Sequence, residues 1–355
     1  MNQPVVLSKY DLHQTYQWNY DHPPEPVDVE LCDIPGQWSF CGLDVDSPLG
    51  MPAGPLLNGA WILYYASLGL DVLTYKTVRS SQRDCYPLPN LVPVETAQLQ
   101  GGETFLPAAD VMTGSWAVSF GMPSTHPDVW RADVEWTRSQ LPTGKLLSVS
   151  VVGTTQEGSS IDDLADDYAL CARWAVESGA DVVETNFSCP NVSTQDGQIY
   201  CDMASANNVA QRVRAAIGRT PYAIKIGHVT EETNVEALLD AVGPFVDGIA
   251  MTNSVAATVR TADGQELFDG ARRGICGAAT RTASLEQTRH FAAKVAERNL
   301  AIGLIGVGGV GSADDVTAQL DAGAESVHIA TAAMLDPLVA CKVRQEFAAA
   351  QEKHR

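Results

Sequence analysis

The sequence predicts an α/β protein folded as a (β/α)8 TIM barrel. Eight short segments rich in β-favouring apolar residues alternate with segments whose apolar residues recur at helical spacing. This alternation implies parallel strands joined by right-handed crossovers, and the closed form of such a sheet is the TIM barrel. The chain of 355 residues is long enough for one large barrel with a sizeable core.

The expected strands and helices follow one another along the chain. The strands cover residues 45–53, 71–78, 146–152, 181–188, 222–226, 248–253, 301–307 and 326–331. The helices cover residues 57–68, 127–140, 161–178, 203–217, 230–241, 283–298, 312–322 and 335–350. The clearest helix is 161–178, because its apolar residues recur at helical spacing opposite a row of aspartates. Ser160 and Asp163 form a capping-box pattern at its start.

The N-terminal residues 1–44 do not share this rhythm. They are irregular and contain several prolines and aromatic residues. We expect an N-terminal extension that packs on the barrel through Trp18, Trp38 and Phe40, which leaves residues 45–355 as the barrel domain.

Two connections are too long to be simple turns. They are residues 79–126 after the second strand and residues 254–282 after the sixth strand. Both are βα connections, which emerge at the C-terminal face of a barrel, where barrel enzymes hold their active sites. The sequence therefore predicts one barrel decorated by two long loops.

Charge and composition restrict the possible partners. The net charge of −20 would repel a phosphate backbone, so a nucleic-acid partner is not expected. No apolar run approaches the roughly 20 residues that span a bilayer, and the N-terminus lacks a signal-peptide pattern. We therefore expect a cytoplasmic protein with no membrane partner. The eight cysteines form no C-x-x-C pair, which argues against zinc and iron–sulfur sites, and no metal is expected.

Residues 181–191 carry the clearest chemical signal. This stretch starts as a strand and must leave the sheet by Pro190, which has no N–H to donate to a neighbouring strand. Asn186, Cys189 and Asn191 therefore emerge together at a strand end. Two carboxamides and a thiol suit a flat ligand that is rich in amide groups. The alternative is that Cys189 is only a small buried hydrophobic residue.

Other strand ends carry further polar groups. Lys76 and Lys225 lie within apolar strands, where a buried ammonium is costly unless it meets an anion or a ligand. An internal salt bridge at each lysine is the alternative. Gly308 and Gly309 follow the seventh strand and precede a helix, which is where many TIM barrels bind a phosphate group. Together these groups suggest a phosphorylated cofactor across the top of the barrel.

The polar motifs also follow the order and spacing of a known family. They are Lys-Thr at 76–77, Glu-Thr-Asn-Phe-Ser-Cys-Pro-Asn at 184–191, Ala-Ile-Lys at 223–225, Thr-Asn-Ser at 252–254, Gly-Ile-Cys-Gly at 274–277 and Ile-Gly-Val-Gly-Gly-Val at 305–310. Over roughly residues 45–340 the chain resembles the dihydroorotate dehydrogenase family. The Asn-x-Ser-Cys-Pro-Asn element is shared mainly with that family and with the pyrimidine-reducing domain of dihydropyrimidine dehydrogenase.

The resemblance implies a flavoprotein whose barrel binds FMN. The residues that it assigns to FMN are Ala53, Gly54, Lys76, Thr77, Asn186, Lys225, Gly277, Gly308, Gly309 and Thr331. Lys225 would stabilise negative charge at the pyrimidine edge of the flavin ring, because a fixed cation favours charge that develops beside it.

The resemblance also implies the reaction. The chain would oxidise dihydroorotate, or a related dihydropyrimidine-like ring, to the unsaturated ring, as in pyrimidine biosynthesis. Cys189 would be the catalytic base, with Lys76 as a second catalytic residue. The residues assigned to the substrate are Asn186, Asn191, Asn253 and Ser254. A cysteine base is typical of the class 1 type, and the resemblance implies a homodimer and an electron acceptor that is a small molecule or a separate protein.

The sequence departs from the family pattern in several places, including Pro52 and Ala330, and two of the departures concern the substrate ring. Where the family has an asparagine-initiated loop that holds the substrate ring, this chain has residues 118–124, which begin with Val118. In the segment after the second strand, Asn90 stands where the family has an arginine. These departures leave a related ring open as the substrate.

Three other functions are consistent with parts of the pattern. A barrel aldolase or synthase could use Lys76 or Lys225 as a Schiff base. A tRNA dihydrouridine synthase also combines a flavin barrel with a cysteine, but the net charge argues against it. The third is a barrel subunit that keeps FMN without catalysing a reaction.

Overall fold

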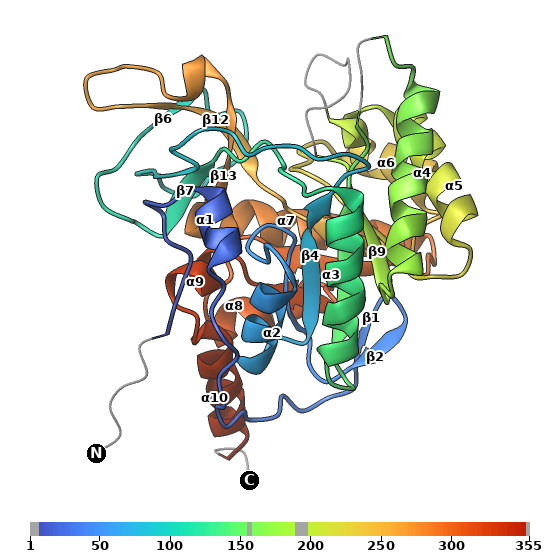
Figure 1. Ribbon diagram of the computed structural model, residues 1–355, viewed down its shortest axis with the longest axis horizontal. Coiled ribbons are helices and arrows are strands. Elements are labelled where there is room, and N and C mark those ends of the chain that lie inside the picture. Colours follow the sequence, from blue (N-terminus) through green and yellow to red (C-terminus); the bar gives the residue numbers. More distant parts are fainter. Residues whose placement is uncertain (1–6, 155–157, 189–197, 353–355) are drawn as a thin grey trace.

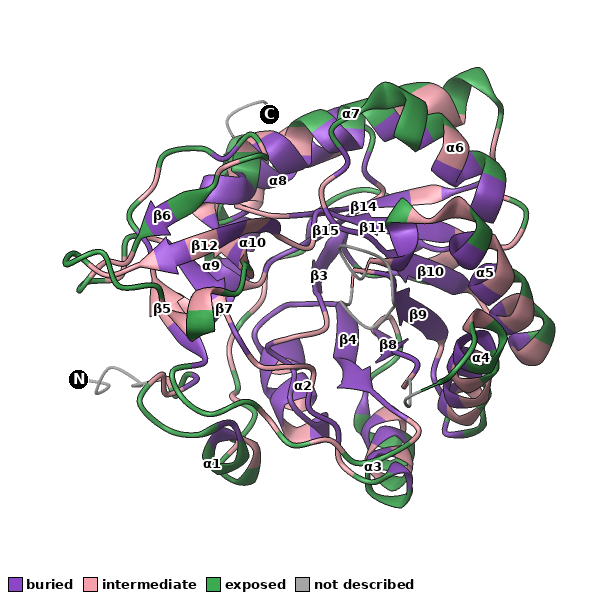
Figure 2. Ribbon diagram, turned by 90° about the horizontal axis from the view of Figure 1, so that it is seen from above, coloured by how far each residue is buried: buried purple, intermediate pink, exposed green. Residues whose placement is uncertain are grey.

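The barrel predicted from the sequence is present. The computed structural model describes residues 7–154, 158–188 and 198–352. Figure 1 shows the whole molecule, and Figure 2 labels the eight parallel strands that close into a barrel in the order β10-β11-β14-β15-β3-β4-β8-β9. The strands are β3 (Leu49–Met51), β4 (Val72–Val78), β8 (Leu146–Val151), β9 (Val182–Asn186), β10 (Tyr222–Lys225), β11 (Gly248–Met251), β14 (Gly303–Val307) and β15 (Ser326–His328).

Helices surround the barrel strands. They are α2 (Gly59–Ser67), α3 (Pro127–Gln140), α4 (Ile161–Glu177), α5 (Met203–Ile217), α6 (Glu232–Val242), α7 (Arg281–Glu297), α8 (Ala313–Asp321) and α10 (Val339–Glu352), with the short helix α9 (Thr331–Leu335) before α10. Seen from above, the strands are buried, whereas the helices expose their outer faces (Figure 2). The eight predicted strands and eight predicted helices are confirmed, with shifts at their ends.

Helix α4 begins with the capping box that the sequence predicts. The Asp163 N–H donates to Ser160 Oγ at 3.1 Å, and the Ser160 N–H donates to the Asp163 carboxylate at 2.8 Å. These bonds satisfy backbone donors that the helix itself cannot pair. Hydrogen bonds from Ser160 also hold the pKa of the Asp163 carboxyl below its usual value.

The first barrel strand is shorter than predicted, because the residues before it form a hairpin. β1 (Trp38–Phe40) pairs antiparallel with β2 (Leu43–Val45), and β3 starts only at Leu49. Phe40 is buried and Trp38 is half-buried, as predicted. Phe40 packs in a cluster that includes Val72, Leu146 and Val182, the first residues of β4, β8 and β9, so the hairpin lies against the N-terminal end of the barrel.

The predicted role of Trp18 is wrong. Helix α1 (Tyr16–Asp21) buries Tyr16 and Asn19, whereas Trp18 is 38% exposed and stacks on His22 with 4.3 Å between ring centroids. Two residues span about 200° around a helix, so Trp18 lies on the face opposite Tyr16. The extension is held by Tyr16 and Asn19 instead.

The two long connections form a second sheet that the sequence did not reveal. Its strand order is β5-β7-β13-β12-β6. The strands are β5 (Leu91–Pro93), β6 (Phe105–Pro107), β7 (Ser115–Val118), β12 (Val255–Arg260) and β13 (Arg273–Gly277). The central β7–β13 pair joins the connection after β4 to the connection after β11. The sheet lies over one end of the barrel (Figure 1).

A buried ion cluster ties the C-terminal helix to the base of the barrel. Asp71, directly before β4, is paired with Lys145, directly before β8, and with Arg344 of α10. Arg344 also donates to the carbonyl of Cys32 at 3.0 Å and to Ser47 Oγ at 2.9 Å. Asp71 is 1% exposed and Arg344 is 4% exposed, so little water can replace either partner. The two charges therefore depend on each other.

We expect Asp71→Asn to lower the free energy of unfolding by about 3–5 kcal/mol, because Arg344 is then buried without its counter-charge. The shift can be measured by chemical denaturation followed by circular dichroism. Arg173→Gln is the matched control, because it breaks an exposed pair with Glu177 and should cost less than about 1 kcal/mol. Equal losses in the two variants would contradict the prediction.

Candidate active site at the mouth of the barrel

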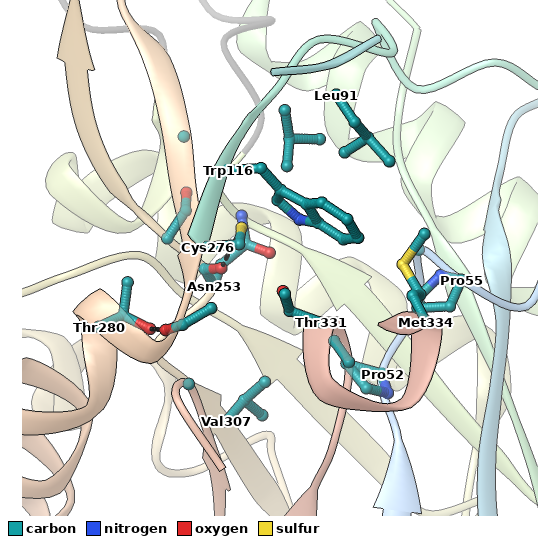
Figure 3. A pocket seen from close by; sticks show the side chains of 18 of the residues that line it. Pro52, Pro55, Leu91, Trp116, Asn253, Cys276, Thr280, Val307, Thr331 and Met334 are labelled. Carbon is teal, nitrogen blue, oxygen red and sulfur yellow. Dashed lines mark hydrogen bonds between the residues drawn. The ribbon is translucent and has the colours of Figure 1, made fainter. Parts of the chain in front are cut away.

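A cavity of about 510 Å³ lies between the barrel and the added sheet. In Figure 3, Pro52 and Val307 mark the barrel side of this cavity, and Trp116 of β7 lies across it. Thr331 and Met334 of α9 project into it from a third direction. The volume is typical of cofactor and small-molecule sites.

The cavity brings together the predicted site residues. Twelve of them lie in the described chain and all twelve line the cavity: Ala53, Gly54, Lys76, Thr77, Asn186, Lys225, Asn253, Ser254, Gly277, Gly308, Gly309 and Thr331. Cys189 and Asn191 lie outside the described residues. Seven of the eight barrel strands, all but β8, therefore bring predicted site residues to one place, and Gly277 comes from β13 of the added sheet. The roles of these residues stay predictions.

The two predicted lysines are both buried at the cavity. Lys225 is 3% exposed, and its Nζ lies 3.7 Å from Glu184 Oε1. The internal ion pair named as the alternative is therefore present at Lys225. Its separation is too long for a hydrogen bond, so the ammonium keeps donors for a ligand. Lys76 is 6% exposed and lines the same cavity.

The glycine turn after β14 presents backbone to the cavity. Gly308 and Gly309 have φ values of +134° and +70°, which favour glycine. A Cβ on Gly309 would lie 2.5 Å from the Cβ of Arg281, and one on Gly308 would lie 3.0 Å from Thr280 Oγ1. By contrast, a Cβ on Gly54 would meet no atom within 4 Å. The cavity thus has a close-fitting turn suited to a phosphate group and open space beside Gly54.

The side chain of Asn186 is oriented by its neighbours. Its Oδ1 accepts hydrogen bonds from the N–H and the hydroxyl of Ser188, at 3.1 and 2.9 Å. Its Nδ2 lies 3.2 Å from Met122 Sδ, a weak acceptor. A ligand carbonyl or carboxylate can therefore compete for the amide donor of Asn186, while its oxygen stays engaged.

Cys276 also lines the cavity, beside Asn253 (Figure 3). Burial raises the pKa of the Cys276 thiol to about 12, against a smaller opposing effect of Lys225. The thiol donates to the carbonyl of Asn253 at 3.5 Å. Cys276 is therefore protonated at neutral pH and is not suited to act as a base.

The two departures that concern the substrate ring contact each other. The Asn90 side chain donates to the carbonyls of Ser119 and Tyr86 at 2.9 and 3.0 Å, and the Ser119 N–H donates to the Asn90 carbonyl at 2.8 Å. Asn90 is 3% exposed. The amide at position 90 thus holds the loop of residues 118–124, from which Met122 reaches the cavity.

In the described part of the chain, the charged side chains that line the cavity are all basic. They are Lys76, Arg83, Lys225, Arg272, Arg273 and Arg281. Arg83, Arg272 and Arg273 form no salt bridge with a described carboxylate. Arg273 lies over the ring of Tyr86, 5.8 Å from its centroid. In a chain of net charge −20, such a lining attracts anions to one place.

The sequence did not identify several cavity residues. Trp116 and Arg273 reach the cavity because β7 pairs with β13, a contact between distant segments. His328 ends β15 and lines the cavity without a polar motif around it. A signal for the arginines was present, since Arg272 and Arg273 directly precede the Gly-Ile-Cys-Gly motif in an acidic chain.

A family model for dihydroorotate dehydrogenase matches residues 37–350. The chain belongs to the dihydroorotate dehydrogenase family. The resemblance in its motifs is therefore confirmed, and the chain is an oxidoreductase of the kind that acts on CH–CH bonds. This membership argues against a barrel aldolase and against a tRNA dihydrouridine synthase.

Individual relatives agree with the family match. The dihydroorotate dehydrogenase of Dictyostelium discoideum is 30% identical over 365 residues, which cover 96% of this chain and 98% of the relative. The dihydroorotate dehydrogenase (quinone) of Bordetella avium is 25% identical and covers 91% of this chain and 84% of its own. The dihydroorotate dehydrogenase A (fumarate) of Lacticaseibacillus paracasei is 27% identical and covers 61% and 69%.

Two further observations concern membranes and metals. Within residues 7–154, 158–188 and 198–352, no helix is long and apolar enough to cross a bilayer. The same residues contain no group of three or more His, Cys, Asp or Glu side chains placed to hold a metal ion.

Proposed function

We propose that this chain oxidises dihydroorotate, or a closely related dihydropyrimidine ring, to the unsaturated ring with FMN as its cofactor. The observation that carries the proposal is the single cavity in which all the described FMN and substrate residues meet. Family membership supports the reaction. The glycine turn, the open space beside Gly54 and the basic lining suit a flat, phosphorylated anion.

The residues divide into those for the cofactor and those for the substrate. Gly308, Gly309 and Thr331 would hold the phosphate, and Lys225 would stabilise negative charge on the ring. FMN supplies an acceptor for the hydride that leaves one ring carbon. The electron acceptor that completes the cycle is a small molecule or a separate protein.

Substrate chemistry falls to the other side chains of the cavity. Asn186, Asn253 and Ser254 would hold the amides or the carboxylate of the ring. Cys189 would take a proton from the carbon beside the one that loses hydride, so that the electrons of that C–H bond form the new C=C bond. Lys76 would favour the thiolate form of Cys189, because a nearby cation lowers a thiol pKa.

An anaerobic titration of the FMN-loaded protein with dihydroorotate tests the proposed function. We expect rapid loss of flavin absorbance, because the substrate transfers two electrons to the bound cofactor. A protein that binds no flavin would refute the proposal. Flavin that stays oxidised with dihydroorotate and also with dihydrouracil would leave an FMN-retaining subunit as the better description.

The role of Cys189 can be separated from cofactor binding. We expect Cys189→Ser to retain FMN while turnover at neutral pH falls by about 10²-fold or more, the scale of losing a positioned base. Turnover should recover partly as the pH rises, because a serine hydroxyl is a weaker acid than a thiol. Cys276→Ser is the control, since Cys276 is protonated throughout the neutral range, and its turnover should change little. Unchanged turnover in Cys189→Ser would remove Cys189 from the mechanism.

Arg272 and Arg273 form a basic rim of the cavity and should matter for substrate capture. We expect the double change Arg272→Gln and Arg273→Gln to lower kcat/KM about tenfold at low salt, because the rim concentrates anions at the mouth. The loss should shrink as salt is added. Arg219→Gln is the matched control, since Arg219 is exposed in the connection from α5 to β10, at the opposite end of the barrel. A loss that is independent of salt, or equal in the control, would contradict this role.

A further inference from the structure

His328 lies in a layer of inward-facing side chains within the barrel. In an eight-stranded barrel the strands are tilted, and each layer takes one side chain from every second strand. The layer of His328 is found by following the strand pairings to the second strand along and then moving two residues toward the C-terminus of that strand. Repeating this step gives Thr74 of β4, Glu184 of β9 and Ala250 of β11. This count returns to His328 after one circuit, so the layer is closed.

The layer is polar and incompletely hydrogen-bonded. Thr74, Glu184 and His328 are all at most 3% exposed. Thr74 Oγ1, Glu184 Oε1 and both ring nitrogens of His328 have no hydrogen-bond partner among the described residues, and neither has Ser148 Oγ on the adjoining strand β8. TIM-barrel layers are usually filled by branched apolar residues. Buried polar atoms without partners in a protein commonly mark ordered water or a ligand.

Most residues that surround this level are small, although the Phe40 ring stacks on His328 with 5.7 Å between centroids. The layer below contains Gly50, Ser148, Ala223 and Ile305 by the same count, and Ala250 lies beside His328 itself. A Cβ on Gly50 would lie 2.4 Å from the His328 ring, so only glycine fits beneath it. The unpartnered polar atoms thus face mostly small residues, and buried polar groups in such a setting are commonly paired with ordered water.

The His328 ring is neutral in this setting. Burial lowers the pKa of His328 to about 3, and the nearby Lys225 adds to that effect. The neutral ring carries one N–H donor and one acceptor nitrogen. It can therefore connect a hydrogen-bond donor on one side to the Glu184 carboxylate on the other.

We propose that ordered water occupies this layer and that His328, acting through the water and Glu184, is a positioning residue for Lys225. Lys225 follows Ile224 on β10, one layer above Glu184, and its Nζ lies 3.7 Å from Glu184 Oε1. Water that donates hydrogen bonds to the Glu184 carboxylate weakens its pull on Lys225. The Lys225 ammonium then stays at the cavity instead of moving toward Glu184. The proposal rests on the proposed function, in which Lys225 meets the flavin ring.

The water is tested first, on the protein without FMN. With ¹⁵N-labelled histidine, His328 is assigned by comparison with His328→Gln. We expect a neutral ring from about pH 5 to pH 8, the range in which histidines normally change charge, and a cross-peak between its ring N–H and long-lived water. A ring that titrates in this range, or an N–H with no contact to water, would overturn the proposal.

The positioning role is tested by the two-electron reduction potential of bound FMN. We expect His328→Leu to weaken the preference for reduced over oxidised cofactor about tenfold, which corresponds to a potential about 30 mV lower. His328→Gln keeps a donor and an acceptor and should retain the native potential. Ile305→Val is the matched control, because it removes one methyl group from the layer below without changing polarity.

The outcomes separate the two proposals. A native potential in His328→Leu, or an equal shift in Ile305→Val, would overturn the positioning role while leaving the proposed function in place. A protein that binds no FMN would overturn the proposed function and the role at Lys225 together. The water cross-peak in the protein without FMN would still decide whether the layer is hydrated.

Discussion

Closure of the barrel is the constraint on which the rest of the molecule depends. Every barrel strand has a parallel neighbour on both sides, so the carboxyl ends of all eight strands meet in one ring. Side chains far apart in the sequence, such as Lys76 and Thr331, become neighbours of one cavity for this reason alone. The hairpin before β3 and the sheet above β4 and β11 then lie at the two ends of the barrel. The backbone hydrogen bonds between the strands thus decide which side chains meet at the site.

Basic residues gather at the cavity, although the chain as a whole is acidic. The chain carries 43 acidic and 23 basic residues, yet the charged residues of the described cavity wall are basic. Such an arrangement is costly without a ligand, because like charges repel and buried ammonium groups lose hydration. The proposed phosphorylated cofactor and an acidic substrate would offset that cost. The pair of Lys225 and Glu184 offsets part of it within the protein.

Local patterns predicted the elements well, and distant contacts account for what they missed. The capping box at Ser160 and the apolar strand runs are short-range signals, and they appear in the structure as expected. The β7–β13 pair joins segments that lie on different connections, so no local pattern marks it. Trp18 was misplaced because aromatic character does not reveal which face of a helix is buried. Asn90 supports residues 118–124 through a hydrogen bond to Ser119, 29 residues away in the sequence, and no local pattern marks such a contact.

The β7–β13 pair has a consequence for how such a barrel can diverge. It fuses two loops that in a simple barrel could each be lengthened or replaced without regard to the other. An insertion in one of them shifts the register of a strand that the other must match. Changes of substrate within this architecture are therefore expected to arise as coordinated changes in both segments, while the barrel below is inherited unchanged. The connection after β4 and the connection after β11 are therefore expected to change together, because β7 and β13 pair.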